Sequence, residues 1–266
     1  MILSVCPNPS IDCTMELEKF YVGQLNRVSN KIVTYSGKAL NTAIGVRRLG
    51  GDSFATGFMY ENEGSLFVAT LDNEGVKNSF VWSKGSVRTN YKIVDHRSML
   101  TEINDKGEKV SLENQQKLVG LVGTLSKSAS VVCMSGSLPD GVADDYYQKL
   151  ISACKKGVKV ILDTAGEKLI KALSSGVYMV KPNLLELEAV AGEKLKTRAD
   201  MIKYYLKNYK LFNLTIKFYG ENRWKKDLSV SSIPVRTLKY TTHTEIICRT
   251  SVKQFAMSLV LPSFLT

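Results

Sequence analysis

The chain has 266 residues, of which 44% are hydrophobic and 23% charged, and its net charge is +11. These values are ordinary for a soluble globular protein, and no window reaches the apolar length of a membrane-spanning helix. The five cysteines are odd in number and form no Cys-x-x-Cys pair, which argues against disulfides and structural zinc and favours a cytoplasmic protein. Lys and Arg are scattered without a nucleic-acid-binding motif, so we expect neither a nucleic-acid nor a membrane partner.

The N-terminal stretch MILSVCPNPSID predicts a first strand that is followed by polar residues. Asp12 stands at the expected end of this strand, and α/β folds gather their ligand-binding groups at such ends. An Asx turn is the purely structural alternative for Asp12.

Two segments, residues 12–36 and 87–104, show period-two alternation of polar and apolar residues. This pattern is typical of half-exposed strands, and it predicts a small antiparallel sheet apart from the main layer. Such a sheet beside a substrate site could act as a lid or as a dimer contact.

Residues 34–51, TYSGKALNTAIGVRRLGG, predict a helix. Its buried face is expected to carry residues at three-and-four spacing, and two glycines follow as C-cap residues: Leu40, Ala43, Ile44, Leu49, Gly50 and Gly51. Free N–H groups at the helix start could hold a phosphate beside Lys38. A turn that only caps the helix is the alternative.

The middle of the chain alternates strands and helices. Residues 129–136, 157–164 and 176–183 are apolar runs typical of doubly covered parallel strands, and residues 144–156 and 166–175 between them have helical patterns. The sequence therefore predicts an α/β fold with a parallel central layer.

Two loops carry candidate ligand-binding groups. SGSLPDG, residues 135–141, combines glycines and serines after a buried strand, so the backbone can approach a ligand at Ser137. KPNLLELE, residues 181–188, places Asn183 three residues before Glu186, a spacing that a simple capping box also explains. No Walker loop is present.

In chain order these pieces resemble the ribokinase-like (PfkB) carbohydrate kinases, in the branch of 1-phosphofructokinase and tagatose-6-phosphate kinase. The matching stretches are NPSID, SGKALN, LNRV, RTNYKI, TEIN, SGSLPDG, LDTAGE and KPNLLELE. The resemblance implies a single ribokinase-like domain over residues 1–266: a three-layer sandwich with a mostly parallel central sheet and a small β-sheet lid, formed by the segments near 12–36 and 87–104. The lid could also pair two chains into a homodimer.

The resemblance also implies roles for individual residues. The substrate, a sugar phosphate, would be bound by Asp12, Gly37, Lys38, Asn41, Arg88, Lys92 and Ser137, with Arg88 and Lys92 facing its phosphate. The cofactor MgATP would be bound by Lys181, Asn183 and Glu186, and Glu186 would act on Mg²⁺ indirectly. One departure is Ser36, which replaces the first glycine of the usual Gly-Gly-Lys.

The larger departure is the C-terminal segment, residues 211–266. Family members carry a Gly-Ala-Gly-Asp motif there, whose Asp is the general base, and this chain has no such motif, so its catalytic residue is unknown. The segment holds one of the 19 glycines, eight Lys or Arg and three acids: Glu221, Asp227 and Glu245. This abrupt change predicts a frameshifted or truncated C-terminus.

Two functions follow from these patterns. The first is ATP-dependent phosphorylation of a ketohexose phosphate, such as fructose 1-phosphate to fructose 1,6-bisphosphate. Loss of a general base typically costs about 10²–10⁴-fold in rate. The alternative is therefore a non-catalytic sugar-phosphate-binding protein, or an inactive kinase remnant.

Overall fold

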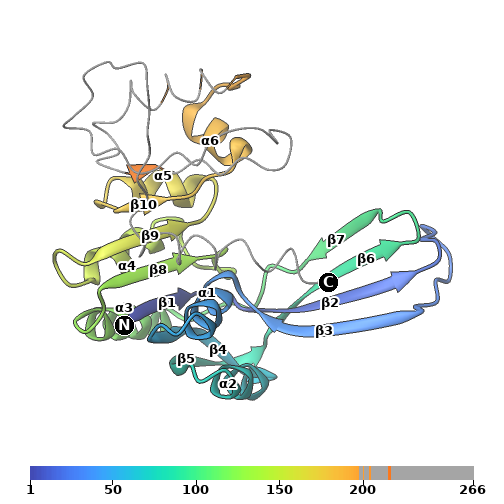
Figure 1. Ribbon diagram of the computed structural model, residues 1–266, viewed down its shortest axis with the longest axis horizontal. Coiled ribbons are helices and arrows are strands. Elements are labelled where there is room, and N and C mark those ends of the chain that lie inside the picture. Colours follow the sequence, from blue (N-terminus) through green and yellow to red (C-terminus); the bar gives the residue numbers. More distant parts are fainter. Residues whose placement is uncertain (198–199, 201–203, 205–214, 217–266) are drawn as a thin grey trace.

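The structure, a computed structural model, describes residues 1–197, 200, 204, 215 and 216. Its centre is a seven-stranded sheet in which every neighbouring pair of strands is parallel. The strand order is β11-β10-β9-β8-β1-β4-β5, with β1 Ile2–Cys6, β4 Ser53–Asn62, β5 Lys77–Ser86, β8 Val131–Ser135, β9 Lys159–Asp163, β10 Met179–Val180 and β11 Thr215–Ile216. The predicted parallel central layer is confirmed (Figure 1).

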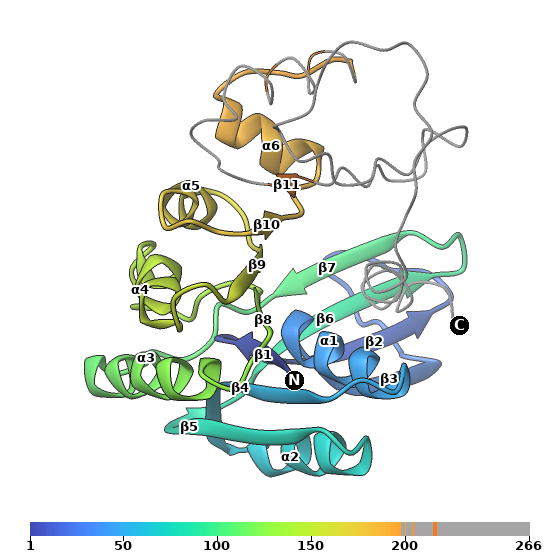
Figure 2. The ribbon, with the colours of Figure 1, turned by 60° about the vertical axis from the view of Figure 1, so that its left-hand side comes forward.

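Helices cover both faces of this sheet. The helices α3, α4 and α5 lie along one face and α1 lies on the other (Figure 2). The bounds are α1 Lys38–Arg48, α2 Gly64–Asn73, α3 Leu112–Ser126, α4 Tyr146–Ala153, α5 Glu167–Leu173 and α6 Leu184–Ala191. The predicted three-layer arrangement is therefore confirmed.

The hydrophobic core fills the space between these layers. The β1 side chains Leu3 and Val5 are fully buried, and they belong to one cluster with Leu40 of α1 and Leu118 of α3. Strands covered on both faces have no polar side to show, which explains the continuous apolar runs of β1 and β8.

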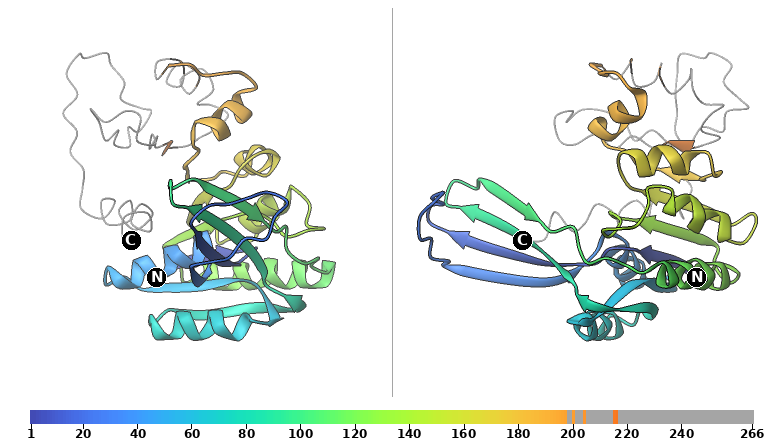
Figure 3. Two further views of the ribbon diagram at one scale, coloured as in Figure 1. Left: turned by 90° about the vertical axis from the view of Figure 1, so that its right-hand side faces the viewer. Right: turned by 180° about the vertical axis from the view of Figure 1, so that it is seen from behind.

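A second, four-stranded sheet projects away from the first (Figure 3). We call it the lid sheet; its order is β3-β2-β6-β7, with β2 Ser10–Leu17, β3 Asn30–Ser36, β6 Arg88–Asp95 and β7 Leu100–Asn104. The prediction of a small second sheet is confirmed, but a purely antiparallel one is wrong, because β2 and β6 pair in parallel. Both strands leave the same edge of the central sheet, after β1 and β5, and so run in the same direction.

Three finer predictions are wrong. Asp12 does not end the first strand: β1 stops at Cys6, before a Pro-x-Pro stretch that lacks two backbone donors, and Asp12 lies within β2. Leu49, the C-cap residue of α1, is 44% exposed because it follows the buried Leu40 by two and a half helical turns and so lies on the opposite side of the helix. Only Met179–Val180 of the predicted strand 176–183 is extended into the sheet.

The predictions for the C-terminal segment fall almost wholly outside the described residues. Of residues 211–266 the structure describes Thr215–Ile216, which pair with β10.

Candidate functional site

Polar groups gather at the carboxyl edge of the central sheet, where β1 and β8 are neighbours. From β1 the chain builds one half of the sheet through β4 and β5, and it then returns to build the other half from β8 onward. Ligands of open α/β sheets bind at such a switch point. The loops after β1 and β8 are joined here, because the Asn8 amide donates a hydrogen bond to the Ser137 hydroxyl over 3.1 Å.

The loop after β8 is held by buried hydroxyls. The Gly136 carbonyl accepts hydrogen bonds from Tyr147 Oη and Thr164 Oγ1, both at 3.0 Å, and both side chains are buried. The N–H and C=O of a trans peptide point in opposite directions, so the Ser137 N–H is directed away from these hydroxyls. Gly136 has a φ of 116°, which glycine adopts without strain. The predicted Ser137 position is therefore fixed by its neighbours.

Lys38 is the first residue of α1, and its ammonium lies 3.6 Å from the carboxylate of Asp163 at the end of β9. The side chain of Lys38 is 59% exposed and that of Asp163 18%. An ion pair this open to water is weak, so the ammonium can turn toward an incoming anion. Asp163 lies in the stretch LDTAGE that matches the family, but the sequence alone assigned it no role.

The start of α1 is packed against the end of β1. A Cβ on Gly37 would lie 2.7 Å from Cys6 Sγ, so only glycine permits this approach. Burial raises the pKa of the Cys6 thiol to about 11. A neutral thiol thus lies against the start of α1, and Lys38, the first residue of the helix, is the charged group at this point.

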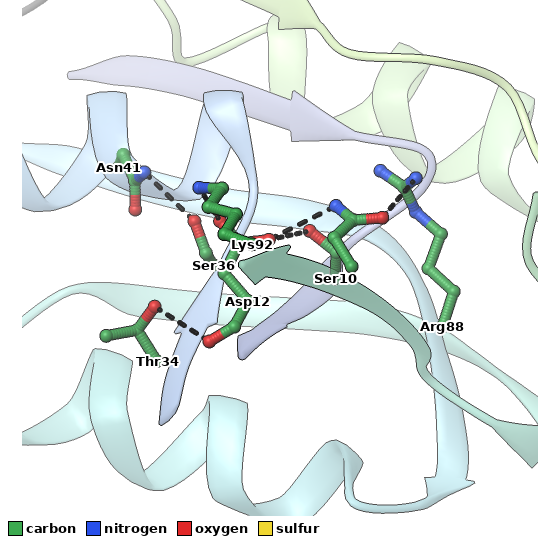
Figure 4. A network of polar contacts seen from close by, with 8 residues as sticks. Ser10, Asp12, Thr34, Ser36, Asn41, Arg88 and Lys92 are labelled. Atoms are coloured by element: carbon green, nitrogen blue, oxygen red, sulfur yellow. Dashed lines mark hydrogen bonds and ion pairs between the residues drawn. The ribbon is translucent and has the colours of Figure 1, made fainter. Parts of the chain in front are cut away.

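The face of the lid sheet that carries Asp12 is polar (Figure 4). One oxygen of Asp12 accepts hydrogen bonds from Ser10 and Asn90, each at 3.1 Å, and the other lies 3.2 Å from the Lys92 ammonium. The parallel register of β2 and β6 places Asp12 directly beside Asn90. Asp12 and Lys92, predicted separately, are thus brought into one ion pair.

Asn41 connects α1 to this face. Its amide donates to Ser36 Oγ over 3.2 Å, and Ser36 is opposite Ser10 in the pairing of β2 and β3. Asn41, Ser36 and Ser10 thus lead from the start of α1 to the Asp12 cluster, as Figure 4 shows. Ser36, which stands where the family pattern has a glycine, thus accepts the hydrogen bond from Asn41.

Arg88, the first residue of β6, is turned toward backbone oxygens. Burial lowers the pKa of its guanidinium. Its hydrogen bonds run to the carbonyls of Pro9 (3.3 Å), Asn8 (3.3 Å) and Asp105 (2.9 Å) and to the Asn90 side chain (3.3 Å).

Lys181, Asn183 and Glu186 lie at the start of α6. The Asn183 side chain accepts from the Glu186 N–H at 2.9 Å, and the Glu186 carboxylate accepts from the Asn183 N–H at 2.8 Å. This reciprocal pair is the capping box that the spacing alone explains. A nucleotide role for these residues stays a prediction.

The described part of the chain lacks two features. There, no helix has the length and apolar character needed to cross a membrane, and no group of three or more His, Cys, Asp or Glu side chains could hold a metal ion.

Comparison with known protein families shows to which family the chain belongs. Residues 7–215 match the model of the pfkB family of carbohydrate kinases, and this range is more than half of the chain. The chain belongs to the pfkB family.

Relatives of this pfkB chain are sugar-phosphate kinases by name. It is 32% identical over 203 residues to 1-phosphofructokinase of Borreliella burgdorferi and 33% identical over 206 residues to tagatose-6-phosphate kinase of Staphylococcus epidermidis. Each match covers 76% of this chain and 66% of the relative, so the chain spans just under two thirds of their length.

The fold of this pfkB chain is also that of solved structures. The tetrameric inhibited form of phosphofructokinase-2 from Escherichia coli aligns with a TM-score of 0.75 and 26% identity, over 82% of this chain and 72% of that one. The resemblance seen in the sequence motifs is thereby confirmed at the level of family and fold.

Proposed function

We propose that this chain binds a phosphorylated ketohexose and descends from enzymes that transfer a phosphoryl group from MgATP to it, as in fructose 1-phosphate to fructose 1,6-bisphosphate. The observation that carries the proposal is the position of Lys38: an exposed ammonium at the carboxyl edge, paired only loosely with Asp163. The names of the relatives support the substrate class.

The lid sheet would supply the remaining substrate contacts. Asp12 and Asn41 are polar groups suited to sugar hydroxyls, Gly37 lets α1 approach, and Ser137 presents its N–H and hydroxyl. Lys92 adds a second cation within the same network. For Arg88 the phosphate role stays a prediction, since carbonyl oxygens already accept most of its N–H groups.

The residues at the α6 start fit a magnesium nucleotide in their chemistry. Mg²⁺ prefers oxygen ligands and keeps several waters, so an indirect contact through the Glu186 carboxylate is suitable. Lys181 supplies a cation next to a helix N-terminus, where phosphate is favoured. Bound MgATP would provide the phosphoryl group; the chain's own residues would orient the sugar.

A second candidate, a non-catalytic sugar-phosphate-binding protein, is favoured by the missing Gly-Ala-Gly-Asp motif. Phosphoryl transfer depends mainly on positioning and on donors that stabilise charge. Losing the base costs about 10²–10⁴-fold and losing a preorganised donor about 10²–10³-fold. On these magnitudes we expect binding without appreciable turnover.

Calorimetry and a coupled kinase assay separate the two candidates. Fructose 1-phosphate is titrated into the protein, and ADP release is then followed with MgATP and the same sugar phosphate. Binding with turnover near background supports the non-catalytic protein, whereas turnover with an ordinary KM supports the kinase. Absence of binding for fructose 1-phosphate, fructose 6-phosphate and tagatose 6-phosphate contradicts both.

The lid sheet also supports a proposed homodimer. Its face opposite Asp12 carries the cross-strand row Val33, Cys13, Tyr91 and Ile103, three of which are 41–55% exposed. Light scattering at several concentrations tests this pairing: a monomer throughout would contradict it.

A further inference from the structure

Gly136 is bonded on both sides of its Cα. Its carbonyl accepts hydrogen bonds from two side-chain hydroxyls, Tyr147 Oη and Thr164 Oγ1, each over 3.0 Å. A carbonyl oxygen has two lone pairs, so this acceptor is fully used. Its N–H donates to the Asp163 carbonyl over 3.1 Å, next to the point where β8 and β9 pair. These bonds fix the orientation of the peptide that joins Gly136 to Ser137.

The two hydroxyls are buried and come from different elements. Tyr147 lies on α4 and is fully buried, and Thr164 directly follows β9 and is 5% exposed. Burial raises the pKa of Tyr147 well above its ordinary value, so the phenol keeps its proton and stays a donor. A buried hydroxyl that loses its acceptor is costly. If the peptide after Gly136 turned over, both hydroxyls would lose the same acceptor at once.

The opposite side of this peptide is open to a ligand. Ser137 is exposed, and a Cβ on Gly136 would meet no heavy atom of the described residues within 4 Å. The Ser137 hydroxyl accepts from the buried Asn8 amide over 3.1 Å, so its own proton can be given to a ligand. Beside it the Ser137 N–H is a second donor. A turned peptide would present the Gly136 carbonyl instead, whose lone pairs repel the oxygens of a sugar phosphate.

We propose that Tyr147 and Thr164 are positioning residues whose hydroxyls together hold the Gly136–Ser137 peptide so that it presents a donor, and not an acceptor, to the sugar phosphate. They act through the Gly136 carbonyl from the buried side of the loop. The ligand in this proposal rests on the proposed function, whereas the orientation of the peptide is tested without any ligand.

Variants that remove only a hydroxyl test the binding. Tyr147→Phe, Thr164→Val and the double variant are titrated with fructose 1-phosphate in a calorimeter. One remaining hydroxyl still favours the wild-type orientation, so each single variant should bind about twofold to threefold more weakly. The double variant should lose about tenfold or more, because the apparent Kd rises as the competent fraction falls. Thr164→Ser keeps the hydroxyl and should bind as wild type does.

Tyr146→Phe is the matched control. Tyr146 is the neighbour of Tyr147 on α4, it is 2% exposed, and its hydroxyl donates to the Gln115 carbonyl over 2.8 Å, away from the loop after β8. Denaturant unfolding should show a stability loss in Tyr146→Phe as in Tyr147→Phe, since each loses one buried hydrogen bond. Only Tyr147→Phe should lose affinity. Equal loss of affinity in both, or wild-type affinity in the double variant, would overturn the proposal.

Crystal structures of the ligand-free proteins test the orientation directly. In the double variant the Gly136–Ser137 peptide should be turned over or present in two orientations. Retention of the wild-type orientation alone would overturn the proposal. If the double variant does not fold, the comparison of Tyr147→Phe with Tyr146→Phe decides. If wild type binds no sugar phosphate, the proposed function fails, while the crystal structures still decide what the two hydroxyls hold.

Discussion

Lys38 and Asp163 face each other across the carboxyl edge of the central sheet, with 3.6 Å between ammonium and carboxylate. One begins α1 and the other ends β9, so the pair joins the two halves of the molecule that meet at the switch point. The ammonium is largely exposed to solvent, whereas the carboxylate is largely covered.

Asp163→Asn should tighten binding of fructose 1-phosphate severalfold in the absence of MgATP. The substitution removes a carboxylate that repels the phosphate and competes for Lys38, and it keeps the side-chain shape. Calorimetry at low salt measures the change. Weaker binding would show instead that the Asp163 carboxylate itself contacts the sugar.

Lys38→Ala should weaken the same complex by about 1.5–3 kcal/mol, the usual value of a hydrogen bond to a charged group. Lys117→Ala is the matched control, because Lys117 is an exposed lysine paired with Glu113 on α3. The phosphate assignment fails if both variants bind as wild type does, or if unphosphorylated fructose loses as much as its phosphate.

The parallel layer and the extent of the lid sheet could be predicted from periodicity alone. Apolar runs such as 131–135 and 159–163 have no polar side because helices cover both faces. The parallel pairing of β2 with β6 could not be predicted, since it depends on where two distant strands leave the central sheet. Leu49 was wrongly grouped with the buried face of α1, since it follows Leu40 by two and a half turns and so lies on the opposite side of the helix.

The sequence predicted which residues belong to the candidate site, but it did not predict which of them contact one another. Asp12 and Lys92 were expected separately, and only the strand register brings them 3.2 Å apart. Asp163 went without a role because nothing in the sequence places it beside Lys38, which only the arrangement of β9 and α1 around the sheet does. The three backbone acceptors of Arg88 lie on distant stretches of chain, and carbonyl positions are invisible in a sequence.

Asp12→Asn should lower the free energy of unfolding by about 1 kcal/mol, because Lys92 loses its partner while it stays partly exposed. For a chain of this size that corresponds to about 2–4 °C in melting temperature. Differential scanning calorimetry measures it, and Lys92→Gln added to Asp12→Asn should cost little more. Strictly additive losses would show that the two side chains do not interact.

Stability should fall as pH rises from about 9 to about 11, since burial raises the pKa of Cys6 from 9.0 to about 11. In that window the unfolded chain has released the thiol proton and the native chain still holds it, so higher pH favours unfolding. The contribution of Cys6 is on the order of 2 kcal/mol. Denaturant titrations of Cys6→Ala should show a shallower fall, and an identical fall would contradict the assignment.

Gly37→Ala should destabilise the protein by about 1–3 kcal/mol, the usual cost of overpacking a core. Its new Cβ would lie 2.7 Å from Cys6 Sγ and 3.3 Å from Leu40 Cγ. The Gly37 backbone is extended, with a φ of 164°, and any residue adopts it, so the entire cost is steric.

Shortening the residue that the new Cβ would clash with should relieve this steric cost. Cys6→Ala removes the sulfur, so the double variant should be more stable than the sum of the two single losses predicts, which a double-mutant cycle of denaturant unfolding measures. Gly50→Ala is the control: Gly50 has a φ of 81° and open space around it, so its cost comes from the backbone. Cys6→Ala should restore part of the stability lost in Gly37→Ala and none of that lost in Gly50→Ala. Of these two glycines, Gly37 is the one that lies against the Cys6 thiol. Equal rescue of both, or of neither, would show that the contact between α1 and β1 is not what requires glycine at this position.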